Sequence, residues 1–150
     1  MRVVLQRVAK AIVSIDGDIT ATIDRGMLVL LGIEHADTRD DVSWLVRKIV
    51  QMRIFSDSEN KMNLSVGEVG GNILIVSQFT LHASTKKGNR PSFVAAAPPD
   101  IARPLYEFFL HTVQEAVHEP VQAGEFGADM QVSLINDGPV TIFIDSKNRT

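Results

Sequence analysis

The hydrophobic positions follow two periods along the chain, and together they predict an α/β fold with a mixed sheet. Runs that alternate or stay apolar over strand length cover residues 3–15, 19–23, 26–33, 73–81, 130–135 and 140–144. Asp16-Gly17 is a two-residue hairpin signal between the first two runs. Because 26–33 and the run that begins at Ile73 are apolar on both faces, we expect them to be central strands.

A period of 3.6 residues marks two helices. The first begins near Asp41, and its apolar face consists of Val42, Leu45, Val46, Ile49 and Val50. Trp44 falls on the opposite face, so it packs either under a loop or at a subunit contact. The second helix follows Pro98-Pro99-Asp100, and its stripe consists of Ile101, Leu105, Phe108, Phe109, Thr112 and Ala116. Since an interior proline costs a hydrogen bond, Pro104 predicts a regular helix that starts nearer residue 101. The glycine-rich stretch 56–71 is expected to be a connecting loop.

Polar residues occur at the end of the apolar run that starts at Ile73. The sequence there is Ser77-Gln78-Phe79-Thr80-Leu81. On a continued strand, Gln78, Thr80 and His82 would share one face. Hydroxyl and amide groups at the end of a buried strand indicate a site, although they could equally satisfy local backbone groups.

A second polar segment, Asn136-Asp137-Gly138-Pro139-Val140-Thr141, separates the last two strand-like runs. Asparagine, aspartate, glycine and proline all favour turns, so taken alone the segment predicts a hairpin connection. Nothing local to Gly138-Pro139 identifies the geometry of its peptide bond.

The two segments together resemble the D-aminoacyl-tRNA deacylase family. The resemblance rests on SQFTL at 77–81, on N-x-GPVT about sixty residues later and on the opening Met1-Arg2-Val3-Val4-Leu5-Gln6-Arg7-Val8. Gly88-Asn89-Arg90-Pro91-Ser92-Phe93 and the pattern at 106–109 extend it over nearly the whole chain. It implies one domain over 1–150, with mixed, mostly antiparallel, barrel-like sheets, two main helices on one side and a homodimeric assembly.

The resemblance also implies the chemistry, namely hydrolysis of the ester that joins a D-amino acid to the terminal adenosine of tRNA. Ser77, Gln78, Phe79 and Thr80 would form the catalytic segment, in which backbone amides near Phe79 and Thr80 hold the developing oxyanion. Water would attack with help from the neighbouring ribose hydroxyl. Thr80 then positions the substrate, so its replacement by alanine leaves much of the activity.

The same resemblance assigns substrate selection to Asn136, Gly138, Pro139 and Arg7. A cis Gly138-Pro139 peptide would reach into the partner subunit's pocket, accept the substrate ammonium and exclude L side chains. Several D-amino acids, and glycyl-tRNA, would therefore be substrates. Arg7 would brace this segment, whereas on its own it reads as a surface arginine on a strand.

Composition limits the partners. The net charge is −3, so any contact with RNA must be local; Lys86, Lys87 and Arg90 supply three positive charges just after the catalytic segment. Without the resemblance these residues would be read as a solvated loop. No apolar run approaches the roughly 20 residues of a membrane span, and we expect a soluble, cytoplasmic protein that binds neither membrane nor DNA. The absence of cysteine fits a reducing compartment.

Two other functions remain open. One is a small esterase in which Thr80 is the nucleophile and His82 its base, although side chains at i and i+2 on a strand are roughly 7 Å apart, too far for the hydrogen bond they need. By itself, His82 is more simply a surface or loop histidine. The other is a non-catalytic tRNA-binding module. His35, His111 and His118 are scattered, so neither a metal nor another cofactor is expected.

Overall fold

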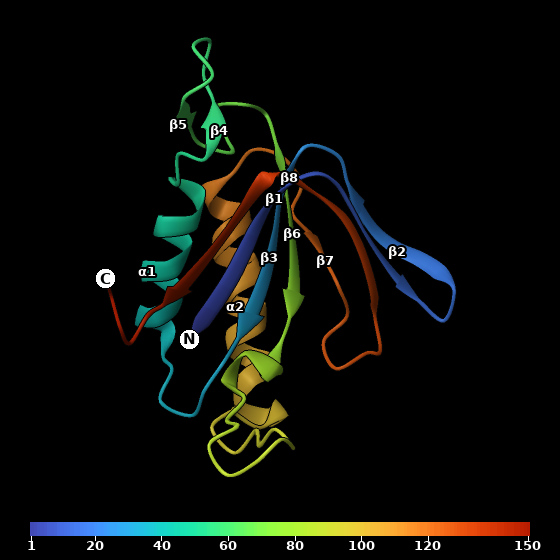
Figure 1. Ribbon diagram of the computed structural model, residues 1–150, viewed down its shortest axis with the longest axis vertical. Coiled ribbons are helices and arrows are strands. Elements are labelled where there is room, and N and C mark those ends of the chain that lie inside the picture. The colour runs from blue at the N-terminus through green and yellow to red at the C-terminus, as the bar shows by residue number, and fades with distance from the viewer.

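The computed structural model describes residues 1–150 as one curved sheet with two helices against one of its faces (Figure 1). The helices are α1 (Arg39–Val50) and α2 (Pro99–Ala116). The main sheet contains β1 (Arg2–Ile15), β2 (Asp18–Ile23), β3 (Gly26–Gly32), β6 (Asn72–Ser77), β7 (Gln122–Ala123) and β8 (Gln131–Asp145). A separate hairpin consists of β4 (Phe55–Ser56) and β5 (Met62–Leu64), and a 3₁₀ helix, η1 (Phe79–His82), follows β6. The predicted α/β class is confirmed.

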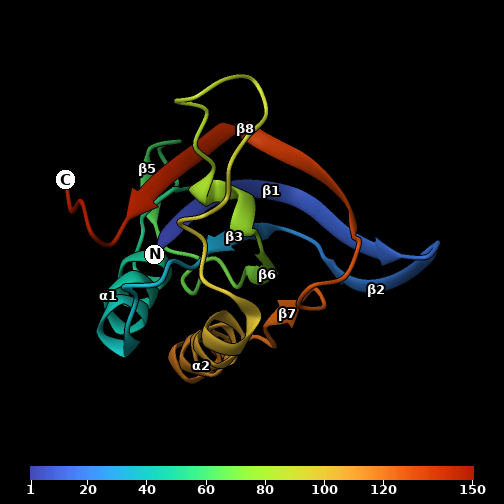
Figure 2. The same cartoon turned by 90° about the horizontal axis from the view of Figure 1, so that it is seen from below.

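The long strand β1 organises the sheet. It pairs antiparallel with β2, β3 and β8, whereas β3 pairs with β6, and β6 with β7, in parallel. Asp16 and Gly17 both have positive φ angles in the tight turn between β1 and β2, as the hairpin signal predicts. The sheet is therefore mixed and mostly antiparallel, and the arm formed by β1, β2 and β8 curls toward a barrel (Figure 2).

Alternation along the strands divides the core between the two sheet faces. Val3 and Leu5 of β1 lie on the helix side, where they join the predicted apolar stripe of α1 and the buried face of α2. The stripe predicted for α2 is largely wrong, because Ile101 and Ala116 are exposed and the buried residues, apart from Phe109, are neighbours of the predicted ones: Ala102, Tyr106 and Val113. Val8, Ala11 and Val13 belong to a second cluster inside the curled arm, where they meet Leu28 and Leu74. Neither helix has the length and hydrophobicity that a bilayer crossing requires.

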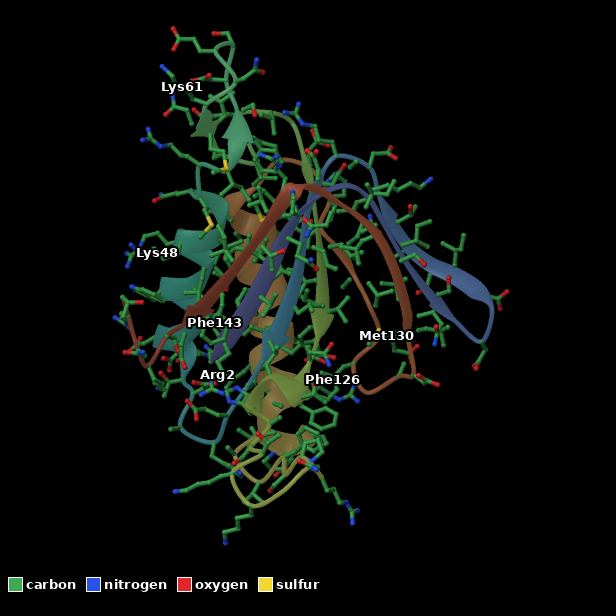
Figure 3. All side chains as sticks on the ribbon, viewed as in Figure 1. Arg2, Lys48, Lys61, Phe126, Met130 and Phe143 are labelled. Carbon is green, nitrogen blue, oxygen red and sulfur yellow. The ribbon has the colours of Figure 1, made fainter.

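One part of the sheet remains open on the side away from the helices. Val4, which alternates with Val3 and Leu5, pairs with Leu30 on one side and with Phe143 on the other. Val4 and Leu30 are only half-buried, and the Phe143 side chain is 59% exposed. Figure 3 shows Phe143 in front of the sheet. An uncovered apolar strip of this kind is typical of an interaction surface.

The expected hairpin at 136–141 is wrong. The segment is an irregular part of one continuous strand, β8, whose two halves both pair with β1. The register against β1 shifts between Gln6 and Val8 and again between Val8 and Lys10. Since β1 is long enough to pair with both halves, the turn-forming residues make a bulge and the chain does not reverse.

Two boundaries also differ from expectation. The stretch 56–71 is not wholly a loop, because it contributes the short antiparallel pair β4–β5. The second helix begins at Pro99, not near residue 101. Pro104 is tolerated because the carbonyl that loses its partner belongs to Asp100; both residues lie on the exposed face, where water can bond that carbonyl.

Trp44 packs under the C-terminal tail, where the Arg149 guanidinium lies 4.6 Å from its ring centroid.

A buried polar network joins the two ends of the chain to the start of α1. The Met1 α-amino group bonds Asp37 and the Ser146 hydroxyl, which donates to Asp41 at 2.7 Å. Lys147 Nζ donates to the other Asp41 oxygen at 2.8 Å. Burial raises the pKa of Asp41, but the hydrogen bonds from Lys147, Ser146 and Thr38 outweigh it and hold that pKa far below its ordinary value. The ionised carboxylate therefore stabilises the folded chain.

We predict that Asp41→Asn lowers the free energy of unfolding by about 2 kcal/mol at neutral pH, because it removes the charge that Lys147 and Ser146 share. Since the folded-state pKa is lowered, this stabilisation is present above the ordinary value of 3.8 and disappears as the pH falls below it. Urea unfolding between pH 3 and pH 7 measures both effects. Asp40→Asn, an exposed acid in the same helical turn, is the control, and equal losses for the two variants would contradict the prediction.

Candidate active site

The polar segment after β6 winds into a 3₁₀ turn and does not continue as a strand. Gln78 N donates to Leu31 O at 2.8 Å, and the turn then closes as Leu81 N donates to Gln78 O. The expectation that Gln78, Thr80 and His82 share a strand face is therefore wrong. It fails because the backbone of Gln78 leaves strand geometry, with ψ of 77°, so side-chain alternation ends at Ser77.

The turn ties the polar side chains to one another. Gln78 Nε2 donates to Thr80 Oγ1, so the amide fixes the hydroxyl. Phe79 points outward, 57% exposed, and meets the Phe93 ring edge-on at 5.1 Å between centroids. Because η1 begins at Phe79, the Phe79 and Thr80 N–H groups have no carbonyl partner within the turn. They are absent from the backbone hydrogen bonds that form outside the regular elements, so both are available to a ligand.

His82 is not a surface or loop histidine. It is 2% exposed, and its Nε2 is the one buried side-chain polar atom without a hydrogen-bond partner. Its ring packs on β3, where Cδ2 would lie 3.1 Å from a Cβ placed on Gly32. Thr80 Oγ1 is bonded to Gln78, and no hydrogen bond joins it to His82. The arrangement offers no general base to a Thr80 nucleophile.

A pocket of about 600 Å³ opens beside this turn. Three walls surround it. The first consists of Ser77, Gln78 and Phe79, the second of the start of α2 with its preceding loop, and the third of residues 126–130. Most of the lining is apolar, and the volume is in the range of small-molecule sites. Tyr106 supports the site from behind: its hydroxyl donates to Ile75 O at 3.3 Å, and burial raises its pKa to about 12.

The sequence interpretation missed the third wall of this pocket. Phe126 and Met130 precede β8, and Figure 3 shows both on the same side of the molecule. Two glycines in the sequence, Gly124 and Gly127, could have indicated this wall. In the structure, a Cβ on Gly124 would lie 2.6 Å from Met130 Sδ, and Gly127 has a φ of 78°. Their spacing marks a tight, close-packed turn.

The second motif surrounds the bulge in β8. Asn136 Nδ2 donates to Thr141 Oγ1 at 3.0 Å, and Val140 N donates to Asn136 Oδ1 at 3.3 Å. The Gly138-Pro139 peptide is cis, and both residues are exposed. Asn136 thus closes a small hydrogen-bonded loop that presents Gly138 and Pro139 to solvent.

Arg7 lies directly beneath this loop. Its Nε donates to Asp137 O at 3.1 Å and pairs with the Asp137 carboxylate at 3.3 Å, while Nη1 donates to Ile54 O at 2.6 Å. A Cβ on Gly138 would approach Arg7 Nη2 to 2.8 Å. The guanidinium therefore joins the bulge to the segment after α1.

The two motifs lie at opposite ends of one chain, as Figure 1 shows for η1 and the bend of β8. Arg2 on β1 donates to Leu81 O in η1, whereas Arg7 on the same strand bonds Asp137. Five residue steps along the strand separate these anchors by roughly 17 Å. Within one chain, Gly138 and Pro139 do not reach the pocket beside Phe79.

Lys86, Lys87 and Arg90 are exposed on the loop that follows η1. This loop is closed by the isolated bridge between Ser84 and Ser92. The three cations are therefore at the same end of the molecule as the pocket. No three histidine, cysteine, aspartate or glutamate side chains are grouped closely enough to hold a metal ion.

The fold and this site define an α/β protein with an apolar ligand pocket at the carboxyl ends of its central strands, bordered by free backbone donors. The sequence profile of D-Tyr-tRNA(Tyr) deacylase matches residues 4–145. Proteins called D-aminoacyl-tRNA deacylase from Akkermansia muciniphila and Flavobacterium johnsoniae are 61% and 58% identical, over 99% of this chain and 99% of theirs.

Two solved structures share this fold. The c-Myc DNA unwinding element binding protein superposes with a TM-score of 0.92 at 42% identity, over 97% of this chain and 98% of its own. A probable eukaryotic D-amino acid tRNA deacylase gives a TM-score of 0.77 at 21% identity, over 95% of this chain and 97% of its own, which supports the fold. The chain belongs to the D-Tyr-tRNA(Tyr) deacylase family. It is accordingly a hydrolase that acts on ester bonds.

The close approach of η1 to Gly32 generates a prediction about activity. A Cβ at residue 32 would lie 2.9 Å from the Gln78 carbonyl and 3.0 Å from Leu81 Cβ. We expect Gly32→Ala to shift η1 and lower kcat/KM by at least tenfold, because the donors at Phe79 and Thr80 move with it. Kinetics with a D-aminoacyl-tRNA measure the loss. Gly67→Ala, whose Cβ meets nothing within 4 Å, is the control, and unchanged kinetics in Gly32→Ala would contradict the prediction.

Proposed function

We propose that this protein releases D-amino acids from D-aminoacyl-tRNA and rejects L-aminoacyl-tRNA through Gly138-Pro139 of a second copy of the chain. The observation that carries the proposal is the separation of the two motifs. The pocket beside Phe79 and the loop at Gly138 are anchored roughly 17 Å apart on β1. A site that contains both motifs therefore needs two chains.

The open sheet face is the surface on which the second chain would lie. Val4, Leu30 and the exposed Phe143 form its apolar strip, and η1 packs over Gly32 at one end. A two-fold axis across this strip reverses the strand direction of the partner, so the partner's bulge would meet the first chain's turn. Each dimer then has two equivalent sites, and residues 1–150 act as one deacylase domain.

In the ester-binding half of the site, the terminal adenosine of the tRNA enters the apolar pocket and its aminoacyl ester reaches the turn. The Phe79 and Thr80 N–H groups would bond the carbonyl oxygen as it becomes an oxyanion. Ser77 and Gln78 border the same position. The adjacent hydroxyl of the ribose assists the attacking water, which is why the site operates without a nucleophile and base from the protein.

The chirality filter depends on a rigid loop. Arg7 and Asn136 hold the loop from two sides, so Gly138 and Pro139 keep one position. Their carbonyl oxygens accept the substrate ammonium, and an L side chain collides with the loop where a D side chain points away from it. Selection by collision is independent of side-chain identity, so several D-amino acids are substrates. Glycyl-tRNA, which has no side chain, also passes.

Lys86, Lys87 and Arg90 are placed to contact phosphates of the tRNA acceptor end, because their loop extends from the same turn that borders the pocket. Lacking a general positive charge, the chain would bind RNA through this loop. The biological role is proofreading of translation in the cytoplasm, without a metal or another cofactor.

The test of the reaction compares D-tyrosyl-tRNA with L-tyrosyl-tRNA, with ester loss followed over time. We expect rapid loss of the D ester alone. Thr80→Ala should keep its activity within roughly tenfold, since removal of a true nucleophile costs on the order of 10⁴-fold or more. Equal rates on both esters would refute the filter, and a Thr80→Ala variant without activity would identify Thr80 as the nucleophile of an esterase.

A mixed-dimer experiment tests the two-chain site. One variant carries Gly32→Ala to displace η1, and the other carries Pro139→Ala to alter the loop; each alone is expected to be weakly active. When the two are unfolded together and refolded, half of the dimers pair unlike chains, and each of these dimers contains one intact site. Activity should return to roughly a quarter of the wild-type value. No recovery from a mixture that sediments as a dimer would show that each chain uses its own loop.

A further inference from the structure

Asp129 is the only charged side chain that lines the pocket. The other polar groups of the lining are Ser77 and Gln78, and the Gln78 amide nitrogen is bonded to Thr80. Asp129 itself is exposed and takes part in none of the ion pairs of the chain. Its carboxylate is therefore free to accept hydrogen bonds from a ligand.

The backbone holds Asp129 in place. Ala128 N donates to Glu125 O at 3.2 Å, which closes a turn with Gly127 at a positive φ. On the other side, Met130 packs so closely on Gly124 that a Cβ there would lie 2.6 Å from its sulfur. The backbone at Asp129 is thus held between a hydrogen-bonded turn and a packed methionine, which keeps its carboxylate at the pocket.

The position of Asp129 limits what it can recognise. Figure 1 shows the segment between β7 and β8 to the side of η1, with the ends of both segments at the pocket. A ribose whose ester lies at Phe79 can therefore place its base against this segment. The phosphate chain would be repelled by a carboxylate, whereas a purine fits among Phe93, Phe126 and Met130, and its exocyclic amine can donate to Asp129.

We propose that Asp129 recognises the 6-amino group of the terminal adenine and so sets the specificity of the pocket for an adenosine end. The inference rests on the proposed function, because the reacting ester must be carried by that nucleotide. Asp129 accepts the hydrogen bond and takes no part in bond breaking. It selects the base, while Gly138-Pro139 selects the amino acid.

The test is a double-mutant cycle. The Asp129 carboxylate is removed from the enzyme, the 6-amino group is removed from the terminal adenine of the substrate, and the two changes are made singly and together. D-tyrosyl-tRNA ending in adenosine is compared with the same tRNA ending in purine riboside, which lacks the amine. We expect the wild-type kcat/KM to fall roughly 10- to 100-fold on the purine riboside end, since a hydrogen bond to a charged acceptor is lost. Asp129→Ala should be slow on both substrates and distinguish them little, whereas Asp129→Asn, which keeps an acceptor oxygen, should lose less.

Glu125→Ala is the matched control, because Glu125 is an exposed acid of the same turn that does not line the pocket. It should keep the wild-type preference. If Asp129→Ala and the missing amine lower kcat/KM independently, so that their fold-losses multiply when both changes are present, the inference is overturned. It is also overturned if the wild type has the same kcat/KM on the adenosine and purine riboside ends.

Binding measured without turnover separates this inference from the proposed reaction. Calorimetry with adenosine 5′-monophosphate and with the purine riboside 5′-monophosphate reports on the pocket alone. A preference for the amine that disappears in Asp129→Ala supports base recognition even if no D ester is hydrolysed, in which case only the proposed reaction fails. An equal affinity for the two nucleotides overturns base recognition even where D esters are hydrolysed rapidly.

Discussion

The structure depends on the pairing of β1 with three other strands. Each residue from Arg2 to Gln6 has a partner in β3 on one side and in β8 on the other, and the second half of β1 pairs with β2 and again with β8. Its alternation sends Val3 and Leu5 to the helices and leaves Val4 on the open face. Because Arg2 and Arg7 hold the two motifs, the same strand sets the distance between them.

That distance gives the site its organisation. In the proposed reaction, ester chemistry needs a pocket with fixed donors, and η1 packed against Gly32 would supply them. Selection by handedness needs a rigid obstacle, and the loop braced by Arg7 is suited to that purpose. Built at opposite ends of one sheet, the two parts can each be stabilised by their own contacts and still meet when chains associate. The strip around Phe143 is the uncovered surface through which this association would occur.

Much of the fold could be predicted from the sequence because its strongest signals are periodic. The stripe from Val42 to Ile49 and the turn at Asp16-Gly17 correspond to observed elements. The prediction failed where tertiary context overrides local preference. Asn136 to Pro139 have the composition of a turn, but β1 pairs with both sides of the segment and keeps it within a strand. Ser77 to Leu81 could extend a strand by periodicity, and only the contact of η1 with Gly32 shows why the chain turns. The burial of His82 and the pocket wall at Phe126 to Met130 depend equally on contacts between distant segments, which a periodicity cannot encode.

The pairing of β1 with β8 also has a consequence for how the protein is made. Arg2 pairs with Asp145 and Ser14 with Gln131, so the first strand synthesised receives one of its neighbours from the last strand. Contacts of such sequence separation form late and slowly. While the chain is still emerging from the ribosome, β1 can pair with β2 and β3, whereas the C-terminal residues that complete the pocket and pair with β1 as β8 arrive last. The third pocket wall, from Phe126 to Met130, and the loop at Gly138 would therefore be completed together, and only the released chain would hold both parts of the proposed site.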